Sequence, residues 1–157
     1  MSAAGPGHRP PLLDDRGGAV VEFSTLGLVL LLPLIYLVVA LGRIEAASFA
    51  VDGAAREAAR AFVTAPGESV GRGRALAAVR LGLLDQGFDV APDQALTIDC
   101  DRSGCPRPGA VVAARVQLEV VLPGVPAGLD RLLPTRVTVR SEQVLVVDAF
   151  RPRRVRR

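Results

Sequence analysis

Gly17, Gly18 and Glu22 are the residues of this sequence whose types and spacing point most directly to chemistry. Two adjacent glycines give an open, extended backbone of the kind that a protease threads through its cleft. Glu22 then places a carboxylate directly before a long apolar run that begins at Phe23. Such a carboxylate is either an ordinary solvated flank or a charge that serves another group. The glycine pair and the phenylalanine around it favour the second interpretation.

Cys100 and Cys105 lie on the far side of the apolar run, within the turn-like stretch CDRSGCPRPG. In an oxidising compartment two such neighbours pair, so we expect a disulfide. A metal site would need two further ligands, whereas the chain holds one histidine, His8, far from the pair. The spacing also differs from the C-x-x-C spacing of redox-active thiols. We therefore expect no metal site in this chain.

The composition argues against an enzyme and against a nucleic-acid binder. Tryptophan is absent, and the sequence assembles no Ser/His/Asp, Cys/His or paired-carboxylate set, so we expect no catalytic residue, no enzymatic activity and no cofactor. A formal net charge of +3 is too weak to indicate nucleic acid as a partner, and the arginines of residues 151–157 account for it. That basic tail either is solvated or binds anionic wall polymers, phospholipid head groups or an acidic partner.

The apolar run, residues 23–42, contains no charged side chain. A helix of that length covers about 30 Å, the thickness of the hydrocarbon core of a bilayer, so we expect a membrane span with membrane lipid as a partner. The run is longer than the apolar region of a secretory signal, although residues 48–50 leave conventional cleavage open as an alternative. Pro33 lies mid-span, where it either bends the helix one turn earlier or is tolerated without a function.

The flanking charges do not fix the orientation of the span. Arg9 and Arg16 precede it, and Arg43, Arg56 and Arg60 follow it, so the positive-inside rule does not decide. The cysteine pair favours an exterior location for the part of the chain that follows the span.

Beyond the span, the sequence predicts two helices. An alanine-rich stretch with few helix breakers should continue the spanning helix as a stalk to about Val63, where Pro66 breaks it. A second helix is expected over residues 68–86, with Gly87 as its stop. The apolar faces would carry Ala47, Ala54, Ala58 and Ala61 on the stalk and Leu76, Val79, Leu83 and Leu84 on the second helix.

From residue 90 the pattern changes to strands, expected over residues 95–99, 110–122 and 135–150. In the second strand, alternating apolar and polar side chains indicate an antiparallel sheet with one wet face and one face packed on the stalk. The expected fold class is therefore α+β, with a long N-terminal transmembrane and stalk helix, a second helix and a small antiparallel sheet. The covered face of the second strand would carry Ala114, Val116, Leu118 and Val120, and the wet face Arg115, Gln117 and Glu119.

Several of these stretches resemble the TadE-like minor pseudopilins of the Tad/Flp (tight adherence) type IV pilus family. They are the pattern from Gly17 to Phe23, LVLLLPLIYL at residues 28–37, the Gly42-Arg43 pair, and AAREAARAF at residues 54–62. The resemblance implies a pilin-like fold. It also implies that a membrane-embedded prepilin peptidase cuts after Gly17, which leaves Gly18 as the new N-terminus and Glu22 as the fifth mature residue.

The resemblance further implies the partners and the location of the protein. The partners would be the prepilin peptidase, other pilin or pseudopilin subunits and the Tad secretion machinery. The protein would be single-pass in the cytoplasmic membrane, or associated with the pilus, with its N-terminus cytoplasmic. The expected parts are a cytoplasmic leader (1–17), the transmembrane and stalk helix (18–64), an extracytoplasmic α+β head (65–150) and the basic tail (151–157).

Cleavage would give Glu22 and Phe23 a role in assembly. The new α-amino group, whose pKa is near 8 in water, would lie at the edge of low-dielectric surroundings, where an unpaired charge is costly. A carboxylate one helical turn away can neutralise the ammonium of the same or a neighbouring subunit, and such a pair sets axial register more than it adds stability. Close helix packing, aided by small residues, would supply the rest. Those small residues are Gly27, Ala40 and Gly42.

The leading hypothesis is therefore a non-catalytic minor pseudopilin that takes part in pilus assembly or adhesion. The alternative is a signal-anchored extracytoplasmic binding or sensory module, unrelated to pili, in which the spacing from Gly17 to Glu22 is incidental. The two hypotheses differ in the N-terminus of the mature protein.

Overall fold

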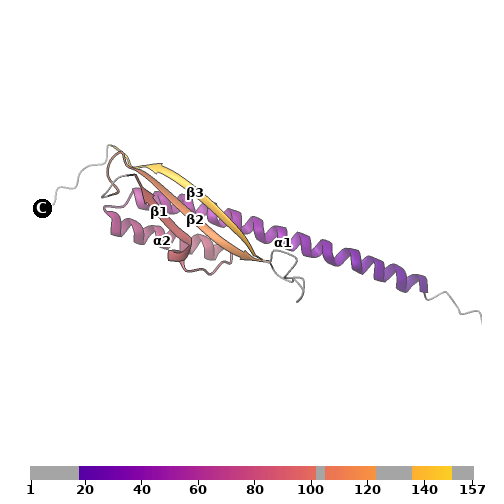
Figure 1. Cartoon of the computed structure of the whole chain (residues 1–157). Coiled ribbons are helices and arrows are strands. Elements are labelled where there is room, and N and C mark those ends of the chain that lie inside the picture. Colours follow the sequence, from indigo (N-terminus) through magenta and orange to yellow (C-terminus); the bar gives the residue numbers. More distant parts are fainter. Residues whose placement is uncertain (1–17, 102–104, 123–135, 150–157) are drawn as a thin grey trace, which may run out of the picture. The chain divides into compact units, whose positions relative to one another are not determined.

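The computed structural model describes residues 18–101, 105–122 and 136–149 (Figure 1). The fold is α+β, as the sequence predicts. The chain divides into two units, Met1–Val38 and Val39–Arg157. Along the chain, the elements are α1 (Gly18–Val63), α2 (Glu68–Asp85), α3 (Pro92–Ala95), β1 (Leu96–Cys100), β2 (Val111–Val121) and β3 (Arg136–Val146).

The described part of the first unit is the N-terminal portion of α1, residues 18–38. Its side chains are mostly large and apolar, and all but the half-buried Tyr36 are exposed. The Thr25 hydroxyl donates a hydrogen bond to the carbonyl oxygen of Val21 at 2.7 Å, so this polar group needs no water. The helix continues through Pro33. By length and composition, α1 is a helix that can cross a membrane.

In the second unit, α1 buries a face of small side chains. Gly82 of α2 faces this side of the helix, where an added Cβ would lie 3.4 Å from the Ala54 Cβ. Contact this close is possible because neither residue carries a long side chain. Ala61, expected on the same face, is only half-buried, because the face turns toward Phe62. Its buried members from residue 47 onward are Ala47, Ala50, Val51, Ala54, Ala55, Ala58, Ala59 and Phe62.

The second helix, α2, ends close to where the sequence predicts, at a glycine. Gly87 has φ +77°, and its N–H donates to the carbonyl of Leu84, while the N–H of Phe88 donates to the carbonyl of Leu83. These two bonds form a Schellman motif, which satisfies the last carbonyls of the helix.

The buried face of α2 partly differs from the expected one. Val79 and Leu83 are buried, but Leu76 is half-buried and Leu84 is 39% exposed. The buried face repeats every four residues and includes two small ones, Gly71 and Ala75, that a search for large apolar side chains overlooks.

The three strands form an antiparallel sheet in the order β1-β2-β3. Ala95, expected to begin the first strand, instead ends the short helix α3, which starts with Pro92. A proline at the first turn is compatible with a helix because the N–H that it lacks would be unpaired there. The third strand ends at Val146, earlier than expected.

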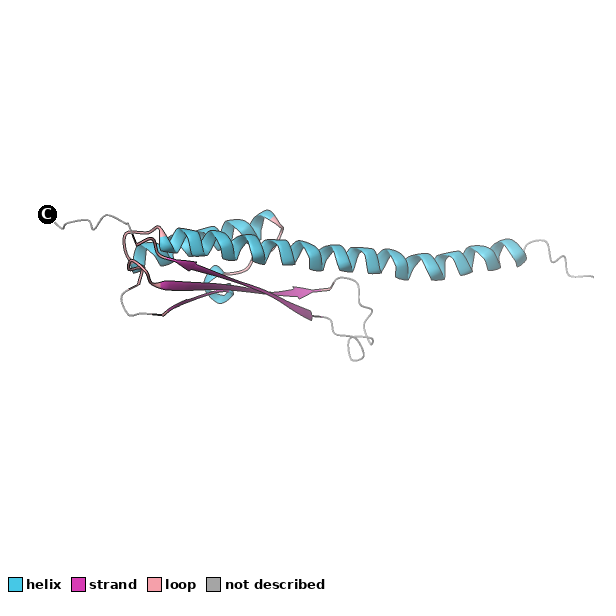
Figure 2. Cartoon of the chain, turned by 90° about the horizontal axis from the view of Figure 1, so that it is seen from above, coloured by secondary structure: helices cyan, strands magenta, loops and turns pink. Residues whose placement is uncertain are grey.

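The expected alternation of β2 is confirmed. Ala114, Val116, Leu118 and Val120 are buried, and the three polar residues between them are exposed. Figure 2 shows the strands on one side of the helices, and the buried residues of β2 share one hydrophobic core with those of α1 and α2. On this inner face, the Ser141 hydroxyl donates to a carboxylate oxygen of Asp52 at 3.1 Å, which links β3 to α1. The sheet therefore packs on the stalk helix.

The close packing at Gly71 predicts opposite effects for two glycines of α2. A Cβ at Gly71 would lie 3.0 Å from Phe62 Cδ2 and 3.2 Å from the Phe62 carbonyl oxygen, whereas nothing lies within 4 Å of one at Gly73. Gly73→Ala should raise the free energy of unfolding by about 0.5–1 kcal/mol through helix propensity. Gly71→Ala should lower the free energy of unfolding by about 1 kcal/mol, because overpacking destabilises the fold by more than the helix propensity of alanine stabilises it.

Denaturant unfolding of the detergent-solubilised chain, followed by circular dichroism, measures both variants. Equal stabilisation by the two alanines would show that Phe62 moves aside at no cost, and would contradict the expected overpacking at Gly71.

Candidate functional site

The candidate leader junction lies at the start of α1. Gly17 is outside the described residues, and Gly18 is the first residue of the helix. Glu22 follows four residues later, so the two lie on the same helix face one turn apart.

Glu22 has no hydrogen-bond or ion-pair partner among the described residues, and its side chain is exposed. It is also the only charged residue of α1 before Arg43. Phe23 beside it is 78% exposed. The junction therefore presents one unpaired carboxylate and one aromatic ring on an apolar helix.

The small residues expected to aid packing between subunits fall into two groups. An added Cβ would meet nothing within 4 Å at Gly27 or at Gly42, so both remain open to another helix. Ala40 is buried within its own chain. Its side chain is therefore not available to a neighbouring subunit in this conformation.

Cys100 and Cys105 are bonded to each other, with 6.4 Å between their Cα atoms. Cys100 is the last residue of β1, and Cys105 is buried in the hydrophobic core. Over the residues that the structure describes, no group of three or more His, Cys, Asp or Glu side chains could hold a metal ion. The pair thus ties the end of a strand to the core.

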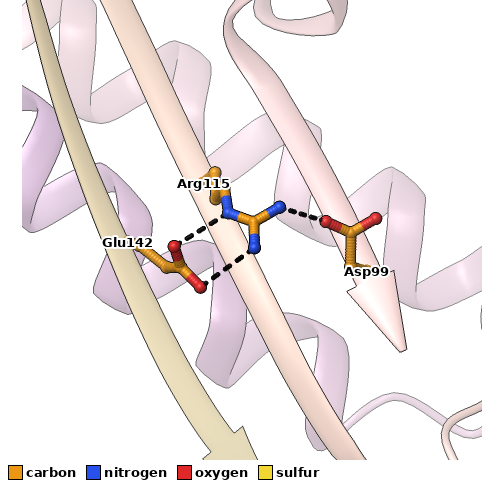
Figure 3. Close-up of polar contacts among 3 residues, drawn as sticks. All are labelled: Asp99, Arg115 and Glu142. Atoms are coloured by element: carbon orange, nitrogen blue, oxygen red, sulfur yellow. Dashed lines mark hydrogen bonds and ion pairs between the residues drawn. The ribbon is translucent and has the colours of Figure 1, made fainter. Parts of the chain in front are cut away.

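The wet face of the sheet carries an ion-pair network centred on Arg115 (Figure 3). Its Nε donates to Glu142 Oε2 at 2.8 Å and its Nη2 to Glu142 Oε1 at 3.2 Å, while Nη1 donates to Asp99. The three residues come from β2, β3 and β1, and the strand register places Arg115 directly opposite Glu142. The network therefore joins all three strands across the exposed face.

These contacts shift the pKa values of Arg115 and Glu142 in the directions that are usual for an ion pair. The hydrogen bonds from Arg115 lower the pKa of Glu142, and those same bonds raise the pKa of Arg115. Both groups are solvent-exposed, so the pair fixes strand register more than it stabilises the fold.

Arg43 marks the end of the apolar run and lies over the ring of Phe88, with its guanidinium carbon 5.0 Å from the ring centroid. Phe88 is buried and belongs to the Schellman motif that ends α2. This cation–π contact ties the helix to the rest of the second unit at the point where charged residues resume. Sequence reasoning missed the contact because the two residues are far apart along the chain.

Residues 17–60 match the family model described as TadE-like protein. The chain is TadE-like over this segment. The matched residues include the candidate leader junction, the apolar run, Arg43 and all the buried alanines of α1. Searches of curated proteins and of solved structures returned no match.

The match points to a role related to the Tad pilus, the system with which TadE-like proteins are associated. Within the described residues, one helix is long and apolar enough to cross a membrane, which fits a single-pass membrane anchor. The expected resemblance to TadE-like proteins is confirmed by the family match.

The Arg115 network predicts a pH-dependent stability difference. Because the folded-state pKa of Glu142 is lowered, its contribution is complete above the ordinary value of 4.5 and is lost as the pH falls through the lower folded value. Glu142→Gln should therefore lower the melting temperature at pH 7 and should lower it by less at pH 3. Thr138→Ala, an uncharged change on the same exposed face of β3, should show no such pH dependence. A Glu142→Gln effect that is equal at both pH values would contradict a charge-based role.

Proposed function

We propose that this TadE-like protein is a non-catalytic minor pseudopilin. A prepilin peptidase cuts after Gly17, and the mature chain takes part in assembly of the Tad pilus or in its adhesion. One observation carries the proposal: Glu22, a carboxylate without a partner among the described residues, lies one helical turn after Gly18 at the start of an apolar helix. The partners are the peptidase, other pilin subunits, the Tad secretion machinery and membrane lipid.

Electrostatics explains why this geometry suits a processed subunit. Cleavage leaves an α-ammonium at Gly18, and both this charge and that of Glu22 are costly beside hydrocarbon. In an assembled bundle of helices, the ammonium of one subunit pairs with Glu22 of the same or a neighbouring subunit. Since the apolar side chains around them permit sliding in any register, the pair selects one axial position.

We further propose that the N-terminus is cytoplasmic and the part after the span is extracytoplasmic. The bonded pair Cys100–Cys105 supports this orientation, because disulfides persist in oxidising compartments. We also propose that the second unit is not catalytic. Its described charged side chains are largely exposed and several are joined in ion pairs, whereas catalytic groups commonly lie in clefts that perturb their pKa values.

The cleavage proposal predicts the N-terminus of the mature protein. N-terminal mass mapping of membrane-extracted protein should find Gly18 first when the host's prepilin peptidase is present, and the uncut start when it is deleted. Gly17→Ala should abolish processing, because a side chain at the cut position obstructs the protease cleft. Gly7→Ala, the same change earlier in the leader, should be processed normally. Retention of residues 1–17 in functioning wild-type protein would overturn the proposal.

The register proposal predicts that charge at Glu22 matters after cleavage. Glu22→Gln keeps the shape of the side chain but cannot neutralise an ammonium, so processing should remain normal while incorporation into pili falls at least about tenfold, as expected for a lost pair near hydrocarbon. Immunoblotting of sheared pili measures this incorporation. Glu45→Gln, an exposed carboxylate of the same helix beyond the apolar run, is the matched control and should assemble normally. Normal assembly of Glu22→Gln would remove the register argument.

A further inference from the structure

Helices α1 and α2 of the second unit enclose a groove of about 440 Å³. Several of the residues that line it are small, among them Gly53 and Gly82. Its walls include Phe49, 73% exposed, and Leu81, 63% exposed. Large apolar side chains that stay this exposed beside a hollow are typical of a docking surface.

The groove is acidic at its rim. Glu57 and Asp85 are the charged residues among those that line it, and both are exposed. No arginine is among the described residues that line the groove. An occupant that suits this surface therefore combines cationic and apolar side chains.

The chain itself contains such a segment directly after its last described residue. Residues 150–157 read FRPRRVRR, in which Phe150 and Val155 alternate with arginines. Fully extended, eight residues reach about 26 Å. The segment begins three residues after Val147, whose side chain is buried in the hydrophobic core. The arginines of the segment complement the acidic rim of the groove, and this charge complementarity favours the groove as its place of binding.

We propose that residues 150–157 dock in the groove of the same chain. Arginines of the segment pair with Glu57 and Asp85, and its apolar side chains cover Phe49 and Leu81. While docked, the arginines are withheld from anionic surfaces such as phospholipid head groups.

Photo-crosslinking of the full-length, detergent-solubilised protein tests this proposal. A benzophenone amino acid at position 81 replaces an exposed side chain on the groove wall. Mixing ¹⁴N and ¹⁵N chains before irradiation separates crosslinks within one chain from crosslinks between copies by mass. The expected product joins position 81 to residues 150–157 of the same chain.

Charge reversal supplies the matched variants. Glu57→Arg with Asp85→Arg should reduce the yield of this crosslink about fivefold, since two exposed ion pairs are lost. Asp93→Arg, a carboxylate on α3 outside the groove, should leave the yield unchanged. Circular dichroism of each variant confirms that the fold is intact.

Three outcomes would overturn the proposal. A crosslink to residues 150–157 of the other isotope would assign the groove to the tail of a second copy. A crosslink to a helix of a second copy or to detergent, without the tail product, would assign it to another occupant. An unchanged yield in the folded double variant would show that the acidic rim does not select the segment.

Discussion

The constraint on which the structure depends is that one helix, α1, must satisfy two different surroundings. Its residues 18–38 carry large apolar side chains that the chain itself leaves exposed. From Ala47 onward, the buried side chains are mostly alanines that admit a second helix and a sheet. Hydrocarbon can cover the first set without specific contacts, whereas the second set needs matched partners because protein interiors are close-packed. The change of residue size along α1 thus divides the anchor from the packed unit.

Polar residues in the two parts of α1 follow the same division. In the packed unit, Asp52 forms an ion pair with Arg56 and accepts a hydrogen bond from Ser141, so its charge is used within the chain. Thr25, in the apolar part, donates back to its own helix. Such internal satisfaction is required where no water is present. Glu22 departs from this pattern, which is why it carries the functional argument.

The sequence predicts much of this fold because, in most elements, the apolar side chains recur with the period of a helix or of a strand. The alternation of β2 and the ends of α1 and α2 follow from side-chain types alone. Small residues explain the main errors. At the close contact between α1 and α2, glycine and alanine occupy buried positions. A prediction that assigns buried positions to large apolar side chains therefore placed Leu84 on the buried face of α2, whereas Leu84 is exposed.

The candidate site divides into a predictable and an unpredictable part. The junction residues are contiguous, so spacing suffices to find Glu22. Predicting the Arg115 network requires the register of three strands. The alternation of side chains places Arg115 on the wet face, but it does not show which carboxylates lie opposite. The contact of Arg43 with Phe88 likewise depends on where α2 ends relative to α1.

The carboxylates of the sheet show why pairing with a positive charge outside the described residues is the simplest explanation for Glu22. Asp99, Glu119 and Glu142 of the sheet each pair with an arginine from a neighbouring strand. Glu22 lies beside hydrocarbon-like side chains, where a lone charge costs more than it does on a wet sheet face, yet no described residue pairs with it. A cation from outside the described residues would balance this charge, and the proposed proteolysis after Gly17 would create one within a helical turn of Glu22.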